Sequence, residues 1–516
     1  MKTSTSKKST LSRKPLDWGR VRRVAQGLFL LTWLVLWVST AGLSLDARLL
    51  HLPAKIDPLL ALTQSIASRT LTVEMLLSLV VILITILFGR VWCGWICPVG
   101  TTLDLFSFKR SKITKPGVPE IWRMGKYLLL LATLIAALFG NLSLLVLDPM
   151  TIWIRTLTGG IGPALSTAFT AAEKGLAYIP WMSGPLTWLD HAMRPAIFPT
   201  SDVDVRFVWL PVVLFLLLFL LNLVAERFWC RYLCPLGSLL GLISKFAVFK
   251  RRVNADCVSC GKCTSICPTG TIDAKRGYAS DAKECTMCMD CLHTCPAAAV
   301  KFVAGAGLQE RMSYDPGRRQ LLITGAVALA GLAVLETKPD RLMIGDSHLL
   351  RPPGALDDDL LEKCLRCGLC LRACPTGALQ ASLADAGVTG VFTPVVVPRL
   401  GYCLYSCNKC GQVCPVAAIP PLPLEDKQRW VIGNAFIDEN RCIPWADGGS
   451  CIVCEEMCPL PEKAIVLEER SITRADDSAG ILKLPHVVRE RCIGCGICEY
   501  KCPRGGEAAI RVYRLD

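Results

Sequence analysis

Histidine is scarce in this chain, with five among 516 residues. The five lie outside the long apolar stretches, and no Cys-x-x-Cys-His motif occurs. Haem b between membrane helices needs histidine ligands, and haem c needs that attachment motif. The sequence therefore predicts a protein without haem. It also lacks a Met-rich or His-rich tract of the kind that binds copper. The histidines are His51, His191, His293, His348 and His486.

Charged residues are also few, at 19% of the chain, whereas apolar residues make up 52% and the mean hydropathy is +0.42. This balance excludes an ordinary soluble enzyme, while the polar segments exclude a pure membrane channel. The net charge is +14, and the excess lies in residues 1–23, 100–126 and 245–252, next to apolar segments. Basic residues concentrate there in cytoplasmic loops of membrane proteins. We therefore expect membrane lipid, and no nucleic acid, as a partner.

Four apolar stretches are long enough to cross a bilayer, which takes about 20 residues. They are residues 27–45, 71–91, 127–147 and 207–228. We expect a basic cytoplasmic tail (1–24) and then a four-helix membrane domain (25–250) in the inner membrane of a bacterium. Both basic loops then face the cytoplasm, and the loops 46–70 and 148–205 face outward.

The rest of the chain is predicted to form two α+β ferredoxin-like domains. A cytoplasmic domain covers residues 251–316, and a periplasmic domain covers residues 339–516. Between them, residues 317–338 begin with Arg318-Arg319 and continue into a weakly apolar run. This segment resembles a twin-arginine signal and is either a fifth membrane crossing, which we favour, or a buried helix between soluble domains.

The 28 cysteines fall into six quartets and two pairs. Tight clusters in a long chain indicate metal ligands rather than a disulfide framework. In the domain 251–316, both quartets have the Cys-x2-Cys-x2-Cys-x3-Cys-Pro spacing of bacterial [4Fe–4S] ferredoxins, which differs from the spacing of zinc sites. The fourth cysteine of each run normally ligates the other cluster, so Cys295 joins the first set and Cys267 the second. The two quartets are Cys257, Cys260, Cys263, Cys267 and Cys285, Cys288, Cys291, Cys295.

The C-terminal domain holds four more quartets, which brings the expected total to six [4Fe–4S] clusters. One quartet opens with three intervening residues, and another has its first cysteine eight residues ahead of the rest. By analogy with nested four-cluster proteins, we expect Cys374 and Cys502 to exchange between the outer motifs, and Cys414 and Cys458 between the inner ones. The quartets are Cys364, Cys367, Cys370, Cys374; Cys403, Cys407, Cys410, Cys414; Cys442, Cys451, Cys454, Cys458; and Cys492, Cys495, Cys498, Cys502.

The two remaining cysteine pairs end the second and fourth apolar stretches, each as Cys-x3-Cys-Pro. They are Cys93 with Cys97, and Cys230 with Cys234. Cysteines four residues apart project from one side of a helix, so the two pairs together offer four thiolates. Three readings stay open: a further metal centre, a redox dithiol site, or structural cysteines that are simply buried.

Six clusters without a substrate-binding motif indicate electron conduction, because the cofactor does the redox chemistry and the protein sets spacing and potential. A quinol is the donor that suits a membrane domain. Asp148, Asp190 and His191 are the ionisable groups of the outer loop that could take its protons.

These motifs resemble a known pair of protein families. Asp57-Pro-Leu-Leu, Gln64-Ser-Ile-Ala-Ser68, both Cys-x3-Cys-Pro motifs and two ferredoxin motifs resemble NapH, a membrane quinol dehydrogenase component. Arg318-Arg319, Arg351-Pro-Pro-Gly-Ala-Leu356 and the four later motifs resemble NapG, its exported four-cluster partner. The methylamine-utilisation ferredoxin-type proteins are similar to the same pair.

The resemblance implies a fusion of the two proteins that passes quinol electrons to a periplasmic c-type cytochrome or reductase. Two alternatives remain: an iron–sulfur subunit of a larger respiratory complex with the quinone site elsewhere, or a redox assembly factor for a metalloenzyme. The spacing around Cys403 departs from the NapG pattern and leaves the ligands of that cluster in doubt.

Overall fold

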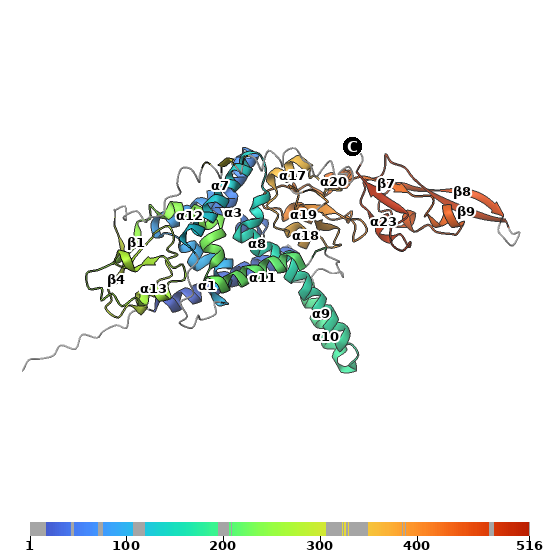
Figure 1. The fold of residues 1–516 in the computed structure, drawn as a ribbon. Coiled ribbons are helices and arrows are strands. Elements are labelled where there is room, and N and C mark those ends of the chain that lie inside the picture. Colours follow the sequence, from blue (N-terminus) through green and yellow to red (C-terminus); the bar gives the residue numbers. More distant parts are fainter. Residues whose placement is uncertain are drawn as a thin grey trace, which may run out of the picture.

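The computed structural model describes residues 17–42, 46–70, 76–106, 119–194, 206–305 and 349–514, apart from 208, 384, 388 and 474–478. Residues 322, 325, 326 and 329 are also described. The molecule is elongated (Figure 1). The domain with two cysteine quartets forms one end, helices form the middle, and the domain with four quartets forms the other end. Nearly all of the expected fifth segment, 317–338, and most of the basic tail lie outside the described residues.

Two helices of the described part are long and apolar enough to cross a membrane, where the sequence predicts four. One is Trp18–Thr40 of α1 (Trp18–Gly42), and the other is Ile121–Leu138, which covers most of η3 (Glu120–Arg123) and all of α7 (Met124–Leu138). The second and fourth apolar stretches form shorter helices, α5 (Leu77–Phe88) and α11 (Trp209–Val224). Gly89 at φ +73° ends α5, and Arg227 at φ +51° follows α11. Backbone in this region cannot continue a right-handed helix.

After each of these shorter helices the chain makes the same turn. The π-helical turns η2 (Trp92–Ile96) and η7 (Trp229–Leu233) lead into α6 (Pro98–Leu105) and α12 (Pro235–Ser244). The amides of Cys97 and Cys234 each donate to a carbonyl five residues earlier, at 2.9 Å. The paired cysteines therefore lie on a π-turn rather than on the regular helix that the sequence suggested.

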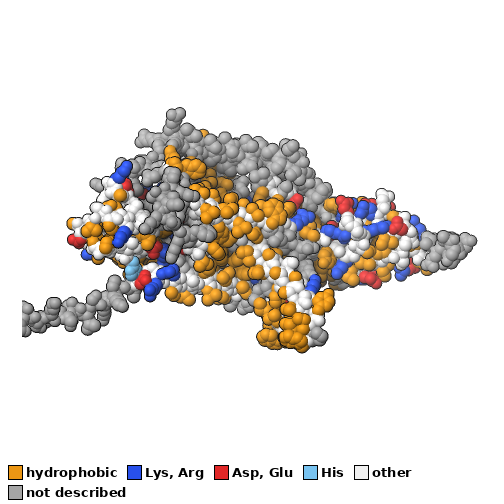
Figure 2. All heavy atoms as spheres, turned by 60° about the horizontal axis from the view of Figure 1, so that its bottom comes forward, with side chains coloured by type: hydrophobic (Ala, Val, Ile, Leu, Met, Phe, Trp, Pro, Cys, Tyr) orange, Lys and Arg blue, Asp and Glu red, His pale blue; other side chains and the backbone are white. Residues whose placement is uncertain are grey.

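The surface of the middle region is apolar, and the charged side chains gather at the two ends (Figure 2). Leu28 of α1, Leu83 of α5 and Leu220 of α11 are 61%, 57% and 59% exposed. A continuous apolar surface of this kind marks a region that contacts a membrane or another protein.

The two segments expected as outer loops are largely helical. The first holds α2 (Ala47–Leu50), α3 (Leu52–Lys55) and α4 (Pro58–Ser68). The second follows η4 (Ser143–Leu147) and holds α8 (Pro149–Thr156), η5 (Leu157–Ile161), α9 (Gly162–Leu176), η6 (Pro180–Met182) and α10 (Ser183–Met193). Helices α9 and α10 project from the body as a hairpin (Figure 1).

Both ferredoxin-like domains consist of short helices and two-stranded antiparallel sheets. The first contains β1 (Phe249–Val253) paired with β4 (Val300–Ala304), β2 (Ile272–Asp273) paired with β3 (Ala279–Ser280), α13 (Lys262–Ile266), η8 (Ala274–Arg276) and α14 (Asp290–Thr294). The second contains α17 (Asp357–Lys363), α18 (Leu369–Ala373), β5 (Leu379–Ala381), β6 (Pro394–Val396), α19 (Lys409–Gln412), α20 (Leu424–Arg429), β7 (Asn434–Ile437), α21 (Ile443–Asp447), α22 (Val453–Glu456), β8 (Ile465–Thr473), β9 (Ala479–Val487), α23 (Ile497–Lys501) and β10 (Ile510–Tyr513). In it β5 pairs with β6, β7 with β10, and β8 with β9.

A buried ion network joins the first ferredoxin-like domain to the helices. The Glu284 carboxylate lies 2.6 Å from Nζ of Lys126, 3.5 Å from Arg90 and 3.9 Å from Arg123. Burial raises the pKa of Glu284, but the surrounding cations outweigh burial and hold that pKa below its usual range. Removing one partner of such a buried network costs several kcal/mol, so the domain is firmly docked.

We expect Gly94→Ala to loosen this docking, because a Cβ at Gly94 would meet the Thr286 carbonyl oxygen at 2.2 Å. Overpacking of this kind costs about 1–3 kcal/mol. The thermal midpoint of the purified chain should fall, and protease cleavage around residues 251–305 should speed up. The matched control is Gly27→Ala on α1, where a Cβ meets nothing within 4 Å. Equal behaviour of the two variants would contradict the close contact.

Candidate iron–sulfur sites

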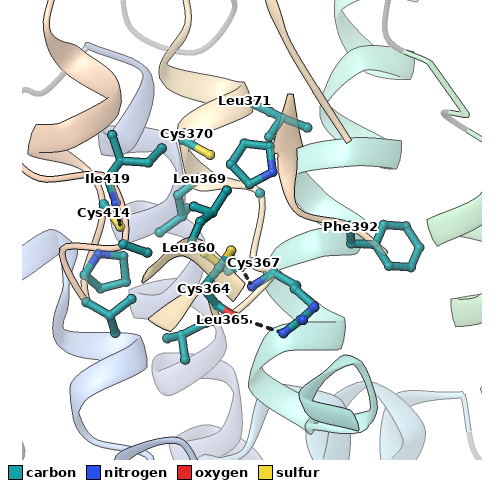
Figure 3. A pocket seen from close by; sticks show the side chains of 16 residues that line it. Leu360, Cys364, Leu365, Cys367, Leu369, Cys370, Leu371, Phe392, Cys414 and Ile419 are labelled. Carbon is teal, nitrogen blue, oxygen red and sulfur yellow. Dashed lines mark hydrogen bonds between the residues drawn. The ribbon is translucent and has the colours of Figure 1, made fainter. Parts of the chain in front are cut away.

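The cysteine side chains of the C-terminal domain gather in sets of four. Cys364, Cys367 and Cys370 line one hollow together with Cys414 of the next motif (Figure 3). Burial raises the pKa of the Cys367 thiol to about 12, and the neighbouring thiols of Cys364 and Cys414 contribute. A thiol must lose its proton to bind metal. Because the pKa is raised, these thiols stay protonated at neutral pH until a metal centre binds and displaces the protons.

Three further sets have the same composition of three cysteines from one motif and one from another. Cys374 lies with Cys403, Cys407 and Cys410. Cys502 shares a second hollow with Cys442, Cys451 and Cys454, and Cys458 lies near Cys495 of the motif Cys492, Cys495, Cys498.

The nested exchange expected from the sequence is therefore wrong. Cys414 joins the motif that begins at Cys364, and Cys374 joins the motif that begins at Cys403. The physical reason is local folding: α18 packs on α19, and α22 packs on α23. Neighbouring motifs thus form one unit, and the exchange needs only a short connection. The irregular spacings at Cys403 and Cys442 still allow both cysteines to reach their sets.

Each set offers the four thiols that a [4Fe–4S] cluster needs, three from one motif and one from its neighbour. Backbone amides also point at the sulfurs: those of Arg366 and Ile419 lie 3.4 Å from Sγ of Cys364 and Cys414. Such hydrogen bonds stabilise cluster thiolates and tune their potential.

The four sets form a line in which each contacts the next. Cys370 of the first set lies near Cys410 of the second. The amide of Cys403 in the second set donates to the carbonyl of Cys495 at 2.8 Å. Cys498 then lies near Cys454. The spatial order is therefore the sets that begin at Cys364, Cys403, Cys492 and Cys442.

In the domain near the N-terminal helices, Cys267 lies beside Cys285 and Cys291, as the interleaved spacing predicts. Nε of Arg251 lies 3.3 Å from Sγ of Cys291. Burial raises the pKa of Cys291, while Arg251 lowers it. A buried cation therefore sits against one ligand of this set, which the cysteine pattern did not reveal.

The structure also brings together the four cysteines of the Cys-x3-Cys-Pro motifs. Cys93, Cys97, Cys230 and Cys234 are 8%, 6%, 8% and 5% exposed and share one apolar core.

The three outer groups proposed as proton acceptors have different surroundings. Asp148 is fully buried and lies beside Asp57, which is also fully buried. Asp190 is held by an ion pair with Arg194, and His191 follows it on α10. Asp57 was missed as a partner of Asp148, although both precede a proline, a repeat that could have revealed it.

Three family models match four segments of the chain. A 4Fe-4S binding domain matches residues 70–116 and 207–254, a 4Fe-4S dicluster domain matches 363–418, and another 4Fe-4S binding domain matches 485–506. The cysteine sets and these domains together define an iron–sulfur electron-transfer protein of the ferredoxin type.

Curated relatives specify the family. The methylamine utilization ferredoxin-type protein MauM of Methylophilus methylotrophus is 34% identical over 38% of this chain and 81% of its own length. MauM of Methylorubrum extorquens is 36% identical over 38% and 89%. The ferredoxin-type protein NapG of Haemophilus influenzae is 32% identical over 40% and 75%. The chain belongs to this family of MauM and NapG ferredoxin-type proteins. No solved structure matches it.

The pairing of motifs can be tested by double substitution. We expect Cys364→Ala and Cys414→Ala each to remove one cluster, about four iron atoms, and the double variant to remove no more. Cys414→Ala with Cys451→Ala should remove two clusters, because the two thiols belong to different sets. Iron and sulfide quantification on anaerobically purified protein measures this. Nested pairing would give the reverse result for the two double variants.

Arg251→Gln should lower the reduction potential of the cluster at Cys267, Cys285, Cys288 and Cys291. Reduction adds negative charge, which the Arg251 guanidinium stabilises at 3.3 Å from a ligand. An EPR-monitored redox titration measures the shift. The control is Arg252→Gln, since Arg252 is exposed. A potential equal to that of the unmodified chain would show that Arg251 has only a structural role.

Proposed function

We propose that this chain is a membrane-bound quinol dehydrogenase component. In this proposal it passes electrons from quinol through [4Fe–4S] clusters to a periplasmic c-type cytochrome or reductase. The observation that carries the proposal is the unbroken line of thiol sets that begins against the apolar helices and runs to the far end of the C-terminal domain. The clusters that these thiols would hold supply one-electron transfer.

The first set of this line is packed directly on the helical region. The Arg372 guanidinium lies 3.8 Å from the centre of the Trp37 ring on α1. The Thr158 hydroxyl donates to the Cys367 carbonyl at 3.1 Å. His51 contacts the carbonyl of Gln412 at 2.9 Å. These three contacts join the C-terminal domain to the helical region, and the close approach suits electron transfer between them.

A proton-accepting group lies on the same side of the helical region. Asp57 and Asp148 cap α4 and α8, each through one carboxylate oxygen that accepts from two backbone amides. The other oxygen of each is buried and has no hydrogen-bond partner in the described part of the chain. Burial raises the pKa of Asp57 to about 7 and raises that of Asp148, to which the charge of Asp57 adds. Such a pair can exchange a proton near neutral pH.

The carboxylate pair and the first thiol set are linked by one short helix. Asp148 caps the start of α8, and the hydroxyl of Thr158, two residues beyond the end of that helix, donates to the Cys367 carbonyl. Ten residues of helix span about 15 Å. Quinol oxidation releases protons and electrons together, so a base this close to an electron acceptor suits that reaction.

We expect Asp57→Asn and Asp148→Asn to slow reduction of the chain by a menaquinol analogue by about 100-fold, the usual contribution of a general base. Asparagine caps helices as well as aspartate does, so both helices should stay intact. Stopped-flow absorbance of the clusters measures the rate. The control is Asp190→Asn on α10, which should reduce at the normal rate.

Reduction by dithionite separates the outcomes. If the variants take electrons normally from dithionite but slowly from quinol, the carboxylate pair acts in quinol oxidation. If the unmodified chain is reduced by dithionite and not by quinol, the quinol site lies on another subunit and the proposal fails.

A further inference from the structure

Exposed tryptophan is distributed unevenly over the surface of this chain. In the described part of the chain, four tryptophan side chains are exposed, and the others are buried or half-buried. By contrast, the exposed apolar side chains of α1, α5 and α11 are chiefly leucine and valine. Tryptophan concentrates where a lipid bilayer meets water, whereas aliphatic side chains face its hydrocarbon core. The four exposed tryptophans are Trp122, Trp181, Trp188 and Trp209.

Two of these tryptophans mark opposite edges of the apolar helical region. Trp122 lies beside Arg123, whose guanidinium donates to the Gly270 carbonyl of the first ferredoxin-like domain at 2.8 Å. Trp209 begins α11 at the other edge. Three residues earlier, the amide of Arg206 donates to the side chain of Gln380 in the C-terminal domain at 2.8 Å. An exposed tryptophan therefore stands at each junction between the apolar surface and a ferredoxin-like domain.

The other two exposed tryptophans belong to the hairpin of α9 and α10, whose root lies at the junction with the C-terminal domain. A Cβ at Gly162, the first residue of α9, would meet the Trp37 ring of α1 at 3.1 Å and the Arg372 guanidinium of the C-terminal domain at 3.4 Å. From this root the hairpin runs outward at a steep angle to α11 (Figure 1). This start and direction suit a segment that lies along a bilayer surface rather than across the bilayer.

The hairpin exposes the aromatic side chains that are typical of membrane surfaces. Tyr178, Trp181 and Trp188 are 89%, 75% and 73% exposed, and no residue of α10 is buried. The side chains seen on the projecting part are largely apolar (Figure 2). Tyrosine and tryptophan combine an apolar ring with one polar group, so they are stable where one side is apolar and the other is wet. Three such rings on one projection favour a lipid headgroup region as their surroundings.

The charges of the hairpin compensate one another. Residues 162–194 contain two acidic and two basic side chains, so their formal charges cancel when histidine is neutral. Arg194 forms ion pairs with both acidic residues, Glu173 at 2.6 Å and Asp190. A surface without net charge does not steer a charged protein partner. Binding to a lipid surface, however, grows with the apolar area that is buried there. The charge pattern therefore also favours lipid.

We propose that the α9–α10 hairpin lies on the outer surface of the lipid bilayer, with Tyr178, Trp181 and Trp188 at the boundary between headgroups and acyl chains. Trp209 lies at the same depth, and Trp122 lies at the opposite surface. Because the root of the hairpin contacts both α1 and the C-terminal domain, the hairpin holds their junction at a fixed height on the bilayer. The proposal rests on the membrane location in the proposed function, but it uses no step of quinol oxidation.

Photocrosslinking to lipid tests the proposal. The full chain is prepared with p-benzoylphenylalanine in place of Trp181 or Trp188, reconstituted into vesicles of phosphatidylethanolamine and phosphatidylglycerol, and irradiated. Mass spectrometry then identifies what is linked to each position. We expect lipid adducts at both positions, joined through the glycerol or the first acyl carbons. Substituting an exposed ring by another aromatic ring should leave the fold intact.

Two positions of similar exposure serve as matched controls. Leu83 on α5 is 57% exposed within the apolar helical region. The probe there should link to deeper acyl carbons. Ile481 on β9 is 64% exposed at the far end of the C-terminal domain (Figure 1). The probe there should give no lipid adduct.

The control at Leu83 separates failure of this proposal from failure of the proposed function. Lipid adducts at Leu83 without adducts at Trp181 and Trp188 would overturn the role of the hairpin and leave the membrane location intact. Adducts at none of the three positions would overturn both. A hairpin that links to a second copy of the chain, or to the ends of the acyl chains, would also contradict the proposal. The same holds for a partner protein linked to the hairpin in the membranes of the expressing cells.

Discussion

The constraint on which this structure depends is the cost of burying ionised thiols. A cysteine thiolate in apolar surroundings is stable only when a metal, a cation or hydrogen-bond donors compensate its charge. In the C-terminal domain, burial raises the pKa of cysteine thiols such as those of Cys370, Cys410 and Cys498. Backbone amides that point at the sulfurs compensate this charge, and buried arginines do so near the helices. Its small sheets and one-turn helices serve to hold these groups in place.

The same constraint explains why polar groups are buried in an apolar helical region. Arg90, Arg227 and Lys126 are each at most 2% exposed. In the described part of the chain, their carboxylate partners are Glu284 and Asp104, both at the junction with the first ferredoxin-like domain. The helix breaks at Gly89 and Pro98 place Cys93 and Cys97 in the buried core of this region.

The sequence predicted the cysteine sets well, because a cluster's ligands lie within a few residues of one another and their spacing is set by local geometry. It predicted the partners of those sets less well. Whether Cys414 joins Cys364 or Cys451 depends on how α18 packs on α19, and that contact leaves no spacing signal. Continuous helices were expected over residues 71–91 and 207–228, but the helices found there are shorter. Hydropathy alone does not reveal where the backbone conformation changes, as it does at Gly89 and Arg227. Asp57 was overlooked because its importance comes from lying beside Asp148, far away along the chain.

The central claim is that the four thiol sets of the C-terminal domain hold one line of [4Fe–4S] clusters that begins against the helical region. Iron anomalous scattering from crystals of the anaerobically prepared full chain tests this claim most directly. The account predicts four iron centres in this domain, in the order Cys364, Cys403, Cys492 and Cys442, with the centre at Cys364 nearest the helices. A map in which the centre at Cys364 lies next to the centre at Cys492 would contradict it.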